Sequence, residues 1–181
     1  MLSKERAINI FIAVLTPIAL AAVVWALRGI SAEAIDGGVI TLAALTVFCS
    51  CYLRIQLPRV NIHVTISDGL IILSMLLYGG EIALLIAVIE TTLASLNILR
   101  QGVSIKPKTI VLNSYFAAIA VFVAAKVVAF MFGPIELIRQ RQDTTALIWL
   151  VVMMALSMFL VNSIFVALFS SLKKERSFWK V

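Results

Sequence analysis

The chain has 181 residues, of which 62% are hydrophobic and 13% are charged. A water-soluble domain is about 45–50% apolar and about 25% charged, so the composition excludes a soluble enzyme, a disulfide scaffold and a disordered chain. It predicts an integral membrane protein. At about 20 apolar residues per spanning helix, the chain holds roughly five to seven helices in one domain. The net charge of +6 is scattered in small groups, which favours contact with lipid headgroups over nucleic acid.

Six apolar segments predict an all-α bundle of six transmembrane helices. In chain order they cover residues 8–27, 39–53, 66–78, 82–99, 109–132 and 146–172. Pro17 is expected to kink or loosen the first helix, which is too long for a signal-peptide core. The third segment is short, because about 13 residues give about 20 Å and the hydrocarbon core is about 30 Å thick.

The basic residues between these segments predict the orientation of the bundle. If all six segments cross, one side carries eleven: Lys4, Arg6, Arg54, Arg59, Arg100, Lys106, Lys108, Lys173, Lys174, Arg176 and Lys180. The other side carries Arg28, Arg139 and Arg141, and Lys126 lies within a helix. The positive-inside rule therefore predicts that both termini are cytoplasmic. The basic segment 173–181, after the membrane domain 1–172, is expected to be either a cytoplasmic tail or a linker to a further domain.

An extended segment is predicted before the short third helix. Apolar and polar residues alternate strictly over residues 60–67, which is typical of a strand, and Pro58 disfavours helix just before it. Since an unpaired strand cannot face lipid, it must lie at the membrane interface, be covered by protein, or pair with a second copy in a homodimer. Thr65 or Ser67 is the expected N-cap of the helix, with Asp68 in its first turn.

Residues 58–96 read PRVNIHVTISDGLIILSMLLYGGEIALLIAVIETTLASL. This stretch resembles the middle of the substrate-binding (S) components of energy-coupling-factor transporters, and also the N-terminal membrane sensor modules of bacterial cyclic-di-GMP signalling proteins. The resemblance implies six helices, cytoplasmic termini, a bacterial inner-membrane location and recognition of a small molecule. S components dock on a transporter partner through small residues of helix one. Here Ala22-x-x-x-Ala26 lies toward the outer end and Ala13-x-x-x-Pro17 is imperfect, which favours a sensory input module over a transporter subunit for vitamin or micronutrient uptake.

Ionisable and amide side chains inside the predicted helices are candidates for function, because such groups are costly in a membrane. Glu90 and Lys126 lie at similar depths, so they are expected to form an ion pair; ligand contact and unpaired side chains are the alternatives. Asn113 and Asn162 are expected to form hydrogen bonds between helices. Hydroxyls near Glu90, those of Thr91, Thr92 and Ser95, are expected to bond back to the preceding turn.

A ligand site is predicted at the outer face of the bundle, where the loops gather polar and aromatic residues. The predicted ligand-binding residues are Trp25, Arg28, Tyr78, Glu81, Arg139, Arg141 and Trp149, with Glu136 and Asp143 nearby. Few convergent polar groups among aromatic walls are typical of small-ligand sites. Arg139 and Arg141 on the outer side suggest an anionic ligand group. An aromatic belt at the interfaces, with Trp179 on the inner side, is the alternative for the tryptophans and Tyr78.

The sequence predicts no metal, cofactor or catalytic site. Cys49 and Cys51 point about 200° apart on a helix, so they neither bridge nor chelate, and His63 is the only histidine. There is no phosphate-binding glycine loop, no nucleophile with a nearby base and no expected pair of carboxylates, so the chain is not expected to be an enzyme. The expected partners are a small molecule, the bilayer, and a cytoplasmic output domain or a transporter module.

Overall fold

The computed structural model describes residues 4–52, 54–56, 63–65, 67–103, 106–133 and 144–174. Within these ranges the fold is helical, with six α-helices and one short hairpin of strands. The elements are α1 (Lys4–Gly29), the 3-10 helix η1 (Ala32–Ala34), α2 (Gly37–Tyr52), β1 (Arg54–Gln56), β2 (His63–Thr65), α3 (Ser67–Tyr78), α4 (Gly80–Arg100), α5 (Pro107–Phe132) and α7 (Thr144–Lys174). The predicted helices are all present, with ends that differ by a few residues.

Four helices are long and apolar enough to cross a membrane: α1, α4, α5 and α7. The other two are apolar but shorter, with 16 residues in α2 and 12 in α3. At 1.5 Å per residue they are only about 24 and 18 Å long. Large apolar side chains also face outward, such as Phe130, which is 91% exposed, and Phe159, which is 66% exposed. Helices that are apolar on all sides belong in lipid, so the structure supports a membrane protein.

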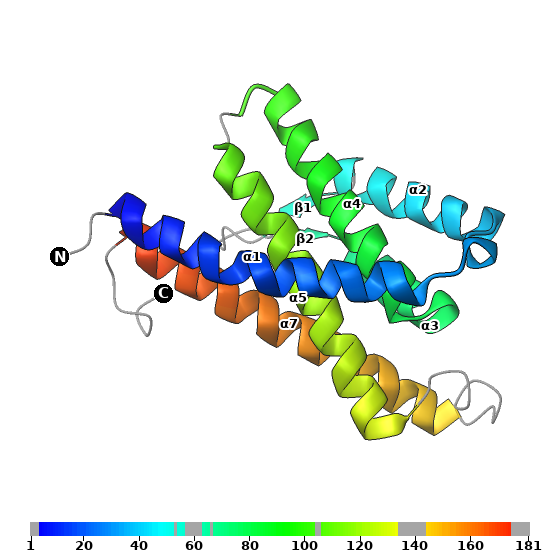
Figure 1. The fold of residues 1–181 in the computed structure, drawn as a ribbon. Helices are drawn as coiled ribbons and strands as arrows, with labels where there is room; N and C mark the ends of the chain where they lie inside the picture. Colours follow the sequence, from blue (N-terminus) through cyan, green and yellow to red (C-terminus); the bar gives the residue numbers. More distant parts are fainter. Residues whose placement is uncertain are drawn as a thin grey trace.

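Helix α5 is the centre of the bundle (Figure 1). It packs against α4 on one side and against α7 on the other, while α2 and α3 pack on α4. Helices α1 and α7 run side by side in opposite directions, so the beginning of α1 and the end of α7 lie at the same end of the bundle. This arrangement is consistent with an even number of membrane crossings between them.

Small residues allow the helices to approach closely. Ala22 and Ala26 of α1 are buried in the main core together with Ala83 and Ala87 of α4. A Cβ atom added at Gly80, the first residue of α4, would lie 2.6 Å from the Cβ of Ala125 on α5. Such contacts between small residues are typical of helix pairs in membranes. The Ala22-x-x-x-Ala26 stripe is therefore used for packing inside this bundle.

The predicted extended segment is confirmed over β2, and its partner comes from the same chain. Strand β2 pairs antiparallel with β1, and Ile55 lies opposite Val64. The alternating pattern predicted a strand but left its partner open, because β1 is too short to show a pattern of its own. Of the rest of the predicted segment, residues 60–62 and 66 lie outside the described ranges. Ser67 is not extended but is the first residue of α3, and Thr65 belongs to β2, so neither residue takes the expected N-cap position just before the helix.

Two adjacent glycines, Gly79 and Gly80, lie between the last residue of α3 and the body of α4, and only the first has a turn conformation. Gly79 has a φ of +89°, a conformation that L side chains rarely adopt, whereas Gly80 is already helical. Helix α1 is continuous through Pro17, so the proline does not end the helix.

Candidate functional site

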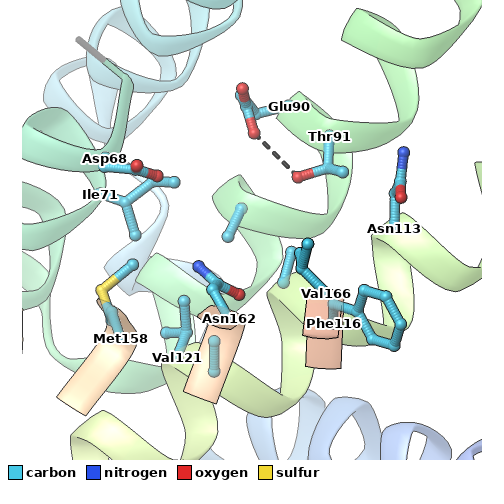
Figure 2. A pocket seen from close by; sticks show the side chains of 13 residues that line it. Asp68, Ile71, Glu90, Thr91, Asn113, Phe116, Val121, Met158, Asn162 and Val166 are labelled. Carbon is cyan, nitrogen blue, oxygen red and sulfur yellow. Dashed lines mark hydrogen bonds between the residues drawn. The ribbon is translucent and has the colours of Figure 1, made fainter. Parts of the chain in front are cut away.

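A cavity of about 210 Å³ lies between α3, α4, α5 and α7 (Figure 2). Its walls are mostly apolar, with polar groups contributed by every one of these four helices. The lining residues are Asp68, Ile71, Ala87, Glu90, Thr91, Asn113, Phe116, Ala117, Ala120, Val121, Met158, Asn162 and Val166. The cavity therefore combines space for a small molecule with groups that can form hydrogen bonds to it.

The spacing of the lining residues follows the helical repeat. On α4 the residues Ala87, Glu90 and Thr91 are three and four apart, which places them on one face. On α7 the residues Met158 and Asn162 are four apart and likewise share a face. Small side chains on α5, such as Ala120, leave the space that larger residues would fill.

Glu90 is the buried acidic group of the cavity. Its side chain is 6% exposed, and one carboxylate oxygen, Oε2, accepts a hydrogen bond of 2.9 Å from the Thr91 hydroxyl. In the part of the chain that the structure describes, no lysine or arginine forms a salt bridge with it. Asp68, in the first turn of α3, is exposed and lies at the rim of the same cavity.

The expected ion pair between Glu90 and Lys126 is wrong. The ammonium nitrogen of Lys126 lies over the Trp25 ring, 4.2 Å from the centroid, and 5.4 Å from the centroid of Phe122. At 100° per residue, Lys126 falls on the face of α5 opposite to the one that lines the cavity. Similar depth in the membrane placed the two residues together in the prediction, but their faces do not meet.

The hydrogen bonds expected of the two asparagines are also absent. Within the described ranges, neither Asn113 nor Asn162 forms a side-chain hydrogen bond, and both amides line the cavity instead (Figure 2). The polar link between α4 and α5 is made by Thr92 and Ser114, whose hydroxyl oxygens are 2.9 Å apart. The amide groups therefore remain available to a ligand.

The hydroxyl groups near Glu90 divide between two roles. Thr92 donates a hydrogen bond to the backbone carbonyl oxygen of Val88, as predicted for a hydroxyl in a helix. Thr91 donates to the Glu90 carboxylate instead of bonding back.

Part of the predicted outer site gathers where α1 ends and α4 begins. Trp25 approaches Gly80, the Tyr78 hydroxyl lies against Gly38, and the Glu81 side chain lies against Gly29. Arg28 is exposed, and Trp149 is 58% exposed on α7. The remaining members, Arg139 and Arg141 with Glu136 and Asp143, lie outside the described residues, as does Trp179. Ligand binding at this end stays a prediction.

Asp68 is a cavity-lining residue that the sequence analysis did not predict. It was expected only to stabilise the start of α3, and no pair of carboxylates was expected. The structure corrects this, because Asp68 and Glu90 line one cavity although they are on different helices (Figure 2). The available signal was the scarcity of acids: the chain has nine, and few of them fall within apolar segments.

Metal and disulfide chemistry find no support in the described residues. No group of three or more histidine, cysteine, aspartate or glutamate side chains there could hold a metal ion. Cys49 and Cys51 are both free thiols. Comparisons of the chain with protein-family models, with curated proteins and with solved structures find no match.

Proposed function

We propose that this chain is the sensory input domain of a bacterial inner-membrane signalling protein, and that it recognises a small molecule in the cavity between α3, α4, α5 and α7. The main support is that Glu90, Asn113 and Asn162 line one cavity of about 210 Å³. Among the described residues, Glu90 has no ion-pair partner, and the side-chain amides of Asn113 and Asn162 form no hydrogen bond. Polar groups in a membrane are costly unless they are satisfied, and a bound ligand would satisfy them.

The proposed topology is that of an S component, with six helices and both termini in the cytoplasm. The uneven distribution of basic residues supports it, and so does the common location of the beginning of α1 and the end of α7 (Figure 1). In this orientation Asp68 and Asn113 lie toward the cytoplasmic half, since each is near the start of a helix that runs outward. Glu90, in the middle of α4, lies near the centre of the membrane.

The cavity is a better ligand site than the outer cluster of Trp25, Tyr78 and Glu81. The outer residues pack against glycines, so their surfaces are partly used in helix contacts. In the cavity, space and unused hydrogen-bonding groups coincide. Its volume is somewhat below the roughly 300–1,000 Å³ of typical ligand pockets, which favours a compact ligand.

Helix α7 is the proposed route from the ligand to the output. It lines the cavity through Met158, Asn162 and Val166. It has 31 residues, so it is about 46 Å long and exceeds the thickness of the hydrocarbon core. A ligand that binds between α7 and α4 would change the position or tilt of α7, and an output domain that follows α7 would receive that change.

The alternative function is that of a transporter's substrate-binding subunit. In that case helix one would dock on a membrane partner through small residues. Ala22 and Ala26 are buried in the core of this bundle, which makes them unavailable for docking and favours the sensor. Ala13 and Pro17 are exposed, so they are the positions to test. Co-purification of an ATP-hydrolysing partner that is lost on Ala13→Leu would support the transporter and contradict the sensor.

Binding in the cavity is tested with the full chain in lipid nanodiscs and a panel of amines, amino acids, carboxylates and nucleosides. Thermal stabilisation is measured for the wild type, for Ala120→Leu, which fills the cavity, and for Ala129→Leu, which is the same change at an exposed position of the same helix. We expect at least one compound to stabilise the wild type and Ala129→Leu but not Ala120→Leu. Equal responses of both variants, or no response to any compound, would contradict the proposal.

Transmission through α7 is tested with the compound that binds. Spin labels at Arg6→Cys and Ser171→Cys, in a protein whose native Cys49 and Cys51 are replaced by alanine, report the distance between the ends of α1 and α7. We expect this distance to change when the compound is added. An unchanged distance at saturating compound would contradict a sensory role while leaving the binding site in place.

A further inference from the structure

The polar groups of the cavity also indicate the charge of the ligand. We infer that the cavity takes a small organic cation, with its ammonium or guanidinium group placed between Glu90 and Asp68. This inference rests on the proposed function and specifies its ligand class. It stands on the cavity, on the identity of the residues that line it and on the burial of Glu90.

The described residues that line the cavity carry negative charge without a matching positive charge. Two of the lining residues are acidic and none is basic. Lys126 lies within the same helix as several cavity residues, α5, but its ammonium group lies over the Trp25 ring on the opposite face of that helix. A carboxylate that is 6% exposed within an apolar bundle needs a positive charge or a proton to offset its desolvation. The protein supplies one hydroxyl donor, from Thr91, and no cation among the described residues.

The size and lining of the cavity fit an organic cation better than a metal ion. Calcium takes six to eight oxygen ligands at about 2.3–2.6 Å, and such a shell requires a tight site. The cavity of about 210 Å³ is much larger, and only two carboxylates line it. An ammonium group offers three donors, which match the carboxylate oxygens and the carbonyl oxygens of Asn113 and Asn162.

The third step is the apolar part of the ligand. Ile71, Val121 and Met158 line the cavity with aliphatic surface, and Phe116 contributes an aromatic ring (Figure 2). Hydrocarbon groups attached to the cation would pack against this surface and gain the free energy of apolar burial. A bare metal ion or a water molecule would leave these walls without contact. The combination of acidic groups and apolar walls therefore fits an alkylammonium or alkylguanidinium better than a simple ion.

The experiment measures affinity for defined probes with the full chain in nanodiscs. The cations are n-butylammonium, choline and butylguanidinium; the comparison compounds are the neutral 1-butanol and 3,3-dimethyl-1-butanol, the anion butyrate, and sodium and calcium chloride. The variants are Glu90→Gln and Asp68→Asn, which keep the shape of each side chain. Glu33→Gln removes an exposed acid in η1 and serves as the matched control.

We expect at least one organic cation to bind the wild type while its neutral counterpart does not. Glu90→Gln should weaken that binding about tenfold or more, because a buried charged partner is removed. Asp68→Asn should weaken it less, since Asp68 is exposed, and Glu33→Gln should leave it unchanged. Affinity that survives in Glu90→Gln would overturn the inference, and so would preferential binding of sodium or calcium.

The remaining outcomes separate this inference from the proposed function. If a neutral or anionic compound binds and Ala120→Leu abolishes its binding, the cavity is a ligand site but the assignment of a cation is wrong. If no compound binds and Glu90→Gln makes the protein more stable, the carboxyl group carries a proton in place of a ligand. That result would overturn both proposals.

Discussion

The contact between Gly80 and Ala125 holds together α4 and α5, which form two walls of the cavity. A Cβ atom at position 80 would lie 2.6 Å from the Ala125 Cβ and 3.4 Å from the Trp25 ring, whereas ordinary contact begins at 3.4 Å. Gly80→Ala therefore requires the two helices to separate by nearly 1 Å. Overpacking of this kind costs about 1–3 kcal/mol. Alanine regains at most about 1 kcal/mol of helix propensity, so we expect a net loss of about 1–2 kcal/mol.

The assay is reversible unfolding in mixed micelles, followed by circular dichroism. The double variant Gly80→Ala/Ala125→Gly lacks the opposing methyl group. Its loss of unfolding free energy should be at most half of the sum of the losses measured for the two single variants. Gly69→Ala is the matched control, because a Cβ atom there meets nothing within 4 Å, and it should be neutral or slightly stabilising. A Gly80→Ala protein as stable as the wild type, or strictly additive losses, would refute the packing argument.

Three further predictions concern side-chain contacts and topology. A double-mutant cycle of Lys126→Met with Trp25→Leu should give a coupling of about 0.5–1 kcal/mol, as for an exposed cation–π contact, and no coupling would reject the contact. A double-mutant cycle of Thr92→Val with Ser114→Ala should give a coupling energy of about 0.6 kcal/mol, which is typical of hydrogen bonds between membrane helices. Additive changes in the unfolding free energy would show that this hydrogen bond does not contribute. A cysteine placed in η1 should react with an impermeant reagent in intact cells while Gly102→Cys is protected, and the reverse pattern would contradict cytoplasmic termini.

The number and approximate ends of the helices follow from hydropathy, because membrane helices need long apolar segments. The extended residues before α3 could also be predicted, because apolar and polar residues alternate there with a period of two. The sequence did not show which faces of the helices meet. A helix that is apolar on all sides has no polar face to distinguish lipid from protein contact, so rotation about its axis is undetermined.

Rotation of the helices explains both the successful and the unsuccessful parts of the site prediction. Glu90, Asn113 and Asn162 were recognised because polar residues stand out in apolar segments, and they do line one cavity. Lys126 was assigned to the same group from its depth alone, and its face directs it to Trp25. Asp68 was interpreted locally, as an acid at a helix start, because nothing in the sequence places it beside α4.

The most direct test of the central claim is a crystal structure of the protein, grown in a lipid phase, with the tightest-binding organic cation. We expect density for that compound in the cavity, with its charged group within hydrogen-bond distance of Glu90 and within reach of Asn113 and Asn162. Density at the outer cluster of Trp25, Tyr78 and Glu81, with none in the cavity, would show that the ligand site is not the cavity.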